Sequence, residues 1–190
     1  MAYLNRAQLQ ELGFKQLGSN VKISEKSSIY DCEKIEVGDN TRIDDFCVVS
    51  GRLKFGRNIY VGPLSLVAGG EEGVVFEDFS TLAYHTQVFT QSDDYLGETM
   101  TNPTVPPKFK NENKLAVHIG RHAIIGAGSI VMPGVVVADG CSVGANSLVT
   151  KSTEPWGVYV GSPARRIMER KKDLLRLEAE YLKGSDSDPI

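Results

Sequence analysis

The sequence predicts an all-β protein in which short parallel strands wind into stacked, three-sided coils. Aliphatic residues recur every six positions from Ile119 to Val149, and a small residue stands four positions after most of them. Gly or another small residue directly follows most of the aliphatic positions. An α-helix would need a period of about 3.6 residues and a strand a period of two, whereas six residues accommodate a short strand and a tight turn. An all-β sandwich is the alternative, but its strands do not keep one strict spacing over so many units.

The same period extends over much of the chain. It runs from Val37 to Val67 and, more weakly, from Phe76 to Val88, while Leu17 to Ile35 forms a degenerate start. Because side chains alternate along a strand, each aliphatic residue and the small residue two positions before it point the same way, into the core. One coil cannot bury its aliphatic face alone, so the coils must stack. We assign the recurring glycines to the turns, whose backbone angles other residues resist.

Two segments break the period and divide a single domain into parts. We expect an N-terminal helix and lead-in at 1–16, β-helix coils at 17–88 and 117–160, an excursion loop at 89–116 and a C-terminal helix at 162–184. The loop holds three of the eight prolines, and loops of this length are usually functional. Ser162 as N-cap and Pro163 in the first turn predict where the last helix begins. Leu174, Leu177 and Tyr181 then recur at helical spacing.

Composition narrows the class of partner. The net charge of −3 gives no electrostatic reason to expect nucleic acid. No apolar run approaches the roughly 20 residues of a membrane span, and the first residues lack the layout of a secretory signal. The three cysteines are odd in number and far apart, which fits a reducing compartment and therefore a cytoplasmic protein.

The six-residue repeat, ending in the segment VYVGSPARRI, resembles the left-handed β-helix acyltransferases with hexapeptide repeats. The segments QSDDYLGETMTNPTVPPKFKN and EPWGVYVGSPARRI are similar to a subgroup of O-antigen and capsule sugar acetyltransferases, which includes the N-acyltransferase of anthrose biosynthesis. The resemblance implies left-handed coils and a homotrimer with active sites between subunits. It also implies acetyl-CoA, or another acyl-CoA, as co-substrate and no metal.

The activity implied by the resemblance is N-acetylation of an amino-deoxy sugar carried on a nucleotide, within surface polysaccharide biosynthesis. O-acetylation of a sugar is the alternative. A remote alternative is a zinc enzyme like the γ-class carbonic anhydrases, which bind zinc through three histidines, the number found here. A non-catalytic scaffold is the other alternative, although a scaffold needs no long polar loop.

Candidate catalytic residues lie just before and within the loop. Counted from the inward aliphatic positions, His85, His118 and His122 all point outward. His85 stands shortly before the loop and is our first candidate for a general base near neutral pH. Asp93 and Asp94 open the loop, where they could accept a proton, orient His85 or bind an ammonium group, or simply start a turn.

Further residues are candidates for binding the two substrates. Tyr84, Tyr95 and Asn102 could line the sugar pocket. By resemblance, the pantetheine arm of coenzyme A lies along backbone that small residues leave accessible, at Gly126, Ala127, Gly144 and Ala145. Lys151, Arg165 and Arg166 could bind its phosphates through charge-assisted hydrogen bonds, or could merely be solvated cations at the start of a helix.

Overall fold

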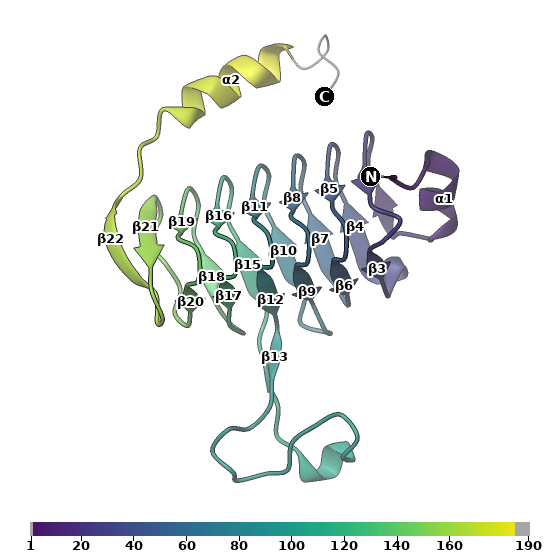
Figure 1. Ribbon diagram of the computed structural model, residues 1–190, viewed down its shortest axis with the longest axis vertical. Helices are drawn as coiled ribbons and strands as arrows, with labels where there is room; N and C mark the ends of the chain where they lie inside the picture. The colour runs from purple at the N-terminus through teal and green to yellow at the C-terminus, as the bar shows by residue number, and fades with distance from the viewer. Residues whose placement is uncertain (1, 185–190) are drawn as a thin grey trace.

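The computed structural model describes residues 2–184 and has three sheets, parallel except for one edge strand, that form the faces of a prism (Figure 1). Each coil of the chain contributes one strand to each sheet. Sheet A contains β1 (Gln16–Leu17), β4 (Ile35–Val37), β7 (Leu53–Phe55), β10 (Val74–Phe76), β15 (Val117–Ile119) and β18 (Val136–Val137). Sheet B contains β2 (Lys22–Ile23), β5 (Arg42–Ile43), β8 (Tyr60–Val61), β11 (Thr81–Leu82), β16 (Ile124–Ile125), β19 (Ser142–Val143), β21 (Gly157–Val160) and β22 (Arg165–Glu169). Sheet C contains β3 (Ser28–Ile29), β6 (Val48–Ser50), β9 (Leu66–Ala68), β12 (Gln87–Phe89), β17 (Ile130–Val131) and β20 (Leu148–Val149).

The corners between the sheets stack into three long edges, which we name by the sheets they join. The A–B edge contains the corners between strands such as β10 and β11, and the B–C edge those between strands such as β11 and β12. The C–A edge lies where each coil passes to the next.

The core consists of the residues that the six-residue period marks as inward-facing. Ile119, Ile125 and Val131 have no exposed surface, and neither do the small residues Ala123 and Ser129 that alternate with them. The predicted inward register is therefore confirmed. Burying a Val or Ile side chain contributes roughly 1.5–3 kcal/mol relative to leaving it exposed, so this column supplies a large share of the stability.

The recurring glycines serve a different purpose from the one the sequence suggested. Gly38, Gly62 and Gly126 do not have positive φ angles, so the assignment of these residues to special turn angles is wrong. A Cβ atom added to Gly38 would lie 2.6 Å from the carbonyl carbon of Gly56 in the next coil. These glycines are needed because successive coils approach too closely for a side chain.

Positive φ angles occur two positions after the glycine that starts a corner. The residue at this second position is often not a glycine. Asn40, Asn58 and Asn146 have φ angles of 56°, 57° and 54°. His85 and His122 occupy equivalent corner positions, with φ angles of 56° and 58°. Asn tolerates this left-handed region better than most residues. The two histidines therefore stand at sharp corners, which turn their side chains away from the core.

The excursion loop leaves the prism at the C–A edge, between β12 and β15 (Figure 1). Its stem is an antiparallel pair formed by β13 (Gln91–Ser92) and β14 (Asn113–Lys114), and it contains one short 3-10 helix, η2 (Pro107–Phe109). Near the stem, Glu112 forms ion pairs with Lys110 and Lys114, both at 2.8 Å. The hydrogen bonds of these two lysines lower the pKa of Glu112 to about 2. The stem thus carries an ionised carboxylate clamped between two cations.

The N-terminal end of the core is covered by α1 (Arg6–Glu11), followed along the chain by the short 3-10 helix η1 (Cys32–Lys34). Asn5 caps α1 by accepting a hydrogen bond from the backbone of Gln8, whose side chain accepts one from the backbone of Asn5. This reciprocal arrangement satisfies two of the amide groups that a helix start leaves free. Leu9 is buried and packs on the open end of the coils.

The C-terminal helix is present but begins later than the sequence predicted. Helix α2 spans Leu174–Gly184, whereas the prediction placed its start at 162. The intervening residues form β22, which pairs antiparallel with β21 after a turn at Gly161, where φ is 99°. Pairing with β21 satisfies the backbone hydrogen-bonding groups of 165–169, and this stabilisation outweighs the N-cap that Ser162 could offer. None of the helices formed by residues 2–184 is long and apolar enough to cross a membrane.

The close approach of the coils gives a stability prediction. We expect Gly38→Ala to lower the free energy of unfolding by about 1–3 kcal/mol, because the new Cβ must displace the backbone of the next coil. Gly184→Ala is the control, since a Cβ there would meet nothing within 4 Å. Urea denaturation of both variants measures the difference, and equal stabilities would contradict the packing account.

Candidate active site

The B–C edge brings together the candidate base and the residues expected to hold coenzyme A. The corners at 83–86, 126–129 and 144–147 lie one above the other and are joined by backbone hydrogen bonds. Gly128 N donates to Tyr84 O at 2.9 Å, and Asn146 N donates to Ala127 O at 2.8 Å. The fold therefore aligns three segments, up to about 60 residues apart in sequence, in one column along the edge.

His85 and Tyr84 project from this column into solvent. His85 is exposed, and its backbone N donates to Pro63 O at 2.8 Å, which fixes the corner. Tyr84 is 60% exposed, and its ring packs over the preceding coil, where a Cβ on Gly62 would lie 2.9 Å from its Cδ1 atom. A substrate placed along the edge can reach both side chains.

The candidate pantetheine-binding corners present backbone rather than side chains. A Cβ on Gly126 would lie 2.6 Å from the backbone N of Ala145, and a Cβ on Gly144 would lie 2.7 Å from a methyl group of Val160. Ala145 is exposed and Ala127 is half-buried. This part of the edge is therefore smooth enough for a flexible chain to lie against the peptide groups.

The candidate phosphate-binding cations lie toward the C-terminal end of the coil stack. Lys151 is exposed just after β20. Arg165 and Arg166 are exposed in β22, where Arg165 pairs with Val160 across the hairpin. Because Val160 packs on Gly144 of the B–C edge, these two arginines lie one strand away from the candidate pantetheine path.

The loop candidates are not near His85 within one chain. Asp94 accepts hydrogen bonds from Leu96 N at 2.7 Å and from Thr99 N at 2.7 Å, and these bonds hold the pKa of its carboxyl below the usual value. Asp93 accepts a longer bond of 3.4 Å from Asn102 N. Both carboxylates thus shape the loop, and sheet C separates the loop from the B–C edge.

The other loop candidates differ in their surroundings. Tyr95 is 89% exposed near the tip of the loop. Asn102 has a φ angle of 79° and accepts hydrogen bonds from the backbone and hydroxyl of Thr104. At the base of the loop lies a cavity of about 410 Å³, whose lining includes Phe89, Thr90, Ser92 and Asp93. Its size suits a monosaccharide ring.

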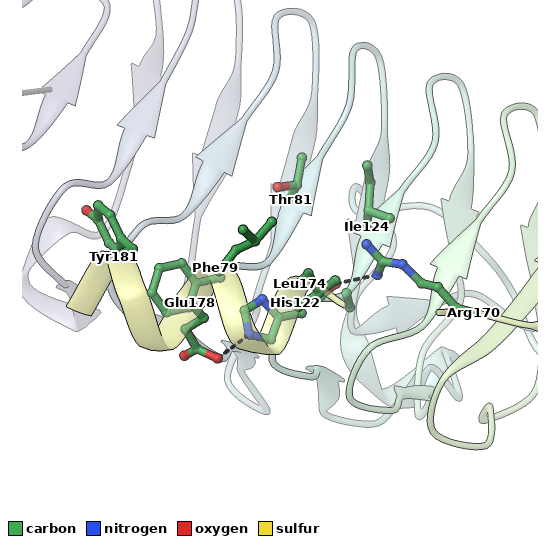
Figure 2. A pocket seen from close by; sticks show the side chains of 10 residues that line it. Phe79, Thr81, His122, Ile124, Arg170, Leu174, Glu178 and Tyr181 are labelled. Atoms are coloured by element: carbon green, nitrogen blue, oxygen red, sulfur yellow. Dashed lines mark hydrogen bonds and ion pairs between the residues drawn. The ribbon is translucent and has the colours of Figure 1, made fainter. Parts of the chain in front are cut away.

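The three histidines do not converge. His118 is in β15 on sheet A, His122 is at the A–B edge and His85 is at the B–C edge. His118 and His122, both expected to point outward, do not share one surface, because the side chain of His122 is only 10% exposed and its Nε2 lies 2.8 Å from Glu178 of α2 (Figure 2). Within residues 2–184, no group of three or more His, Cys, Asp or Glu side chains is arranged to hold a metal ion. The geometry gives the zinc-enzyme alternative no support.

A buried aspartate braces the N-terminal part of the B–C edge, and the sequence analysis missed it. Asp44 is 1% exposed and accepts hydrogen bonds from Arg42 Nε at 2.7 Å, Tyr60 OH at 2.9 Å and Tyr3 OH at 3.0 Å. Burial raises the pKa of Asp44, but the hydrogen bonds from Arg42 and the two tyrosines outweigh burial and leave the pKa below its usual value. The only local signal for this network is the spacing of Arg42 and Asp44, which flank the inward-facing Ile43.

Comparisons with known proteins agree with this geometry. The family model described as bacterial transferase hexapeptide (six repeats) matches residues 116–151. A dTDP-4-amino-4,6-dideoxy-D-glucose acyltransferase from Escherichia coli is 41% identical over 193 aligned residues, which cover 100% of both chains.

Two similar solved structures are of AntD, an N-acyltransferase from Bacillus cereus. One, in complex with dTDP and 3-hydroxybutyryl-CoA, is 39% identical, has a TM-score of 0.95 and covers 97% of this chain and 98% of that chain. The other, a variant in complex with dTDP-4-amino-4,6-dideoxyglucose and coenzyme A, is 40% identical, has a TM-score of 0.95 and covers 96% and 98%.

The repeat, the three-sided coil and these likenesses define a left-handed β-helix transferase built from hexapeptide repeats. More narrowly, the chain belongs to the acyltransferase family of its Escherichia coli relative and AntD. It is therefore an acyl-CoA-dependent enzyme, and the scaffold alternative is wrong.

The Asp44 network gives a pH prediction. Because its folded pKa is lowered, Asp44 stabilises the fold above the unfolded-state pKa of about 3.9, and this contribution is lost as the pH falls through the folded value. We expect Asp44→Asn to cost about 1–3 kcal/mol at pH 7 and less at pH 3. Urea denaturation at the two pH values checks this; a cost that is the same at both would contradict an ionised Asp44.

Proposed function

We propose that this enzyme transfers an acyl group from acyl-CoA to the 4-amino group of dTDP-4-amino-4,6-dideoxyglucose. The observation that carries the proposal is likeness over almost the whole chain to the Escherichia coli enzyme named for this sugar and to AntD, which has been crystallised with it. The excursion loop, where acceptor-binding residues are expected, lies within the matched length. Surface polysaccharide biosynthesis is the setting that such a sugar suggests, and acyl-CoA and nucleotide sugars both favour the cytoplasm.

We place the active site between two subunits of a homotrimer. In one chain the B–C edge and the loop are separated by sheet C, so one chain alone does not bring His85 and the loop together. Phe46 and Leu64 at the B–C edge and Tyr30 just after β3 are 56–57% exposed, and burying exposed apolar side chains of this size favours association. Packing three prisms around an axis would cover this surface and bring a neighbour's loop to the edge.

The proposed reaction forms a bond between the sugar nitrogen and the acyl carbon and breaks the bond between that carbon and sulfur. The amine must be neutral to attack. His85 accepts the proton that the nitrogen loses, and the departing thiolate of coenzyme A then takes up a proton to become the free thiol. Aligning the two substrates along one rigid edge lowers the barrier by itself.

Each remaining candidate has a place in this proposal. Backbone at Gly126 and Gly144, with Ala127 and Ala145, lies along the pantetheine arm, and Lys151, Arg165 and Arg166 bind the phosphates. Tyr84, Tyr95 and Asn102 contact the acceptor. We assign Asp93 and Asp94 to holding the loop in the shape that binds the amino sugar, because their oxygens already accept loop amides.

Acceptor choice tests the proposal directly. We expect thiol release from acetyl-CoA or 3-hydroxybutyryl-CoA with dTDP-4-amino-4,6-dideoxyglucose, and a kcat/KM at least about 100-fold lower with dTDP-6-deoxyglucose, because a neutral amine is a far better nucleophile than a hydroxyl. Mass spectrometry should find the acyl group on nitrogen. A preference for the hydroxyl sugar would instead establish O-acetylation.

His85 can be tested without breaking its corner. Among the non-glycine residues that adopt a positive φ angle at the corners, Asn is the most frequent. His85→Asn should therefore keep the backbone of the corner and remove the base. We expect kcat/KM to fall by about 100-fold, within the usual range for a lost general base. His118→Asn on sheet A is the matched control. If His85→Asn retains near wild-type activity, His85 is not the base and the amine needs none.

A further inference from the structure

The last segment of the chain connects the proposed coenzyme A site to the opposite edge of sheet B. The turn before β22 lies on the B–C edge, where Leu148 N donates to Gly161 O at 3.0 Å and Ala164 N donates to Leu148 O at 2.8 Å. Strand β22 then runs along β21 to the A–B edge, where Arg170 N donates to Trp156 O at 2.6 Å. The two arginines at the start of β22 are therefore held in place from both ends of the strand.

Arg170 fixes the far end of this strand. Its Nη1 atom donates to three backbone carbonyls of the A–B edge, at 2.7 Å to His122 O, 3.1 Å to Gly140 O and 3.4 Å to Cys141 O. These carbonyls belong to two successive coils, so one guanidinium ties β22 to both.

Helix α2 continues the attachment along the A–B edge (Figure 2). Glu178 contacts both Arg121 and His122 of one corner. Burial, followed by the positive charge of Arg121, lowers the pKa of His122. The His122 Nε2 atom lies 2.8 Å from a carboxylate oxygen of Glu178. One turn further on, Tyr181 accepts a 3.0 Å hydrogen bond from Asn58 Nδ2.

Apolar packing under the helix is incomplete. A cavity of about 310 Å³ lies between α2 and sheet B, and its lining includes Thr81, Ile124, Leu174 and Leu177. The polar contacts at the A–B edge, together with the edge-on contact between Phe79 and Tyr181, therefore contribute much to holding α2 in place.

We propose that 165–184 acts as a clamp that orients Arg165 and Arg166 toward the phosphates of coenzyme A, with Arg170 as its main positioning residue. The proposal rests on the coenzyme A placement given above. All residues of β22 are exposed, so little besides strand pairing and the Arg170 anchor fixes its direction. Arg170 lies five residues beyond Arg165, about 16 Å along an extended strand, and its Nη1 is occupied by carbonyls, so it acts through the strand.

The test measures binding of coenzyme A alone by isothermal titration calorimetry, with dTDP as a second ligand. For Arg170→Ala we expect about a tenfold weaker Kd for coenzyme A, the loss typical of a misplaced charged contact. The affinity for dTDP should not change, and kcat at saturating acyl-CoA should stay within about twofold. Arg176→Ala, which removes an exposed arginine from α2, is the matched control. An unchanged Kd for coenzyme A in Arg170→Ala would overturn the proposal.

A double-mutant cycle separates positioning from direct contact. If Arg170 acts through the two arginines, Arg170→Ala should weaken binding little further when Arg165 and Arg166 are already Ala. Additive losses, or a double variant at 165 and 166 that binds coenzyme A like the wild type, would refute the clamp. Because no acceptor is present, these outcomes do not depend on whether the acceptor has been identified correctly.

A milder variant covers the case in which Arg170→Ala does not fold. Glu178→Gln keeps the shape of the side chain and removes the charge facing His122 and Arg121. We expect about a threefold weaker Kd for coenzyme A, roughly 0.65 kcal/mol, whereas Glu180→Gln on the exposed side of α2 should have no effect. Equal affinities in the two variants would count against the clamp.

Discussion

Close contact between successive coils is the constraint on which the rest of the structure depends. Neighbouring strands in a sheet lie about 4.8 Å apart, and this spacing leaves no room for a Cβ atom at the first residue of many corners. Glycine therefore follows the inward aliphatic residue, and a sharp left-handed corner two residues later returns the chain toward the next face. The inward-facing aliphatic residues fill the interior. Because the corners stack directly on one another, the three edges are straight.

Straight edges explain how a fold with a tightly packed interior can support a bimolecular reaction. Corners far apart in sequence are placed in one line, so smooth backbone at Gly126 and Gly144 lies directly beyond Tyr84 and His85. The excursion loop, a long break in this regularity, leaves from a different edge. In the site that we propose, a second copy of the chain supplies the loop, and activity then depends on oligomer formation.

Much of the fold follows from the sequence because the repeat is local and strict. Inward positions such as Ile119 and Val131, the outward direction of His85 and the existence of the loop all follow from counting in sixes. The role of the glycines does not, because a spacing cannot distinguish a turn angle from a close contact with the next coil. The start of the last helix was misplaced because the strand partner of 165–169 lies in β21, and a cap residue carries no information about that pairing.

The candidate site could be predicted only in part from the sequence, because local spacing does not show which distant segments meet. The register identified candidates that lie on one edge, but the carboxylate that pairs with the His122 ring, that of Glu178, lies 56 residues away on α2. Asp44 has no motif, and its meaning depends on Tyr3, which the fold brings to it from the N-terminus. Contacts of this kind between distant segments are seen only in the three-dimensional structure.

A crystal structure of the enzyme with coenzyme A and dTDP-4-amino-4,6-dideoxyglucose would test the central claim most directly. The account predicts the pantetheine arm along the B–C edge against Gly126 and Gly144, with its sulfur beside His85 and the sugar under the loop of a neighbouring chain. Coenzyme A bound at the A–B edge beneath α2, or a site completed within one chain, would contradict it.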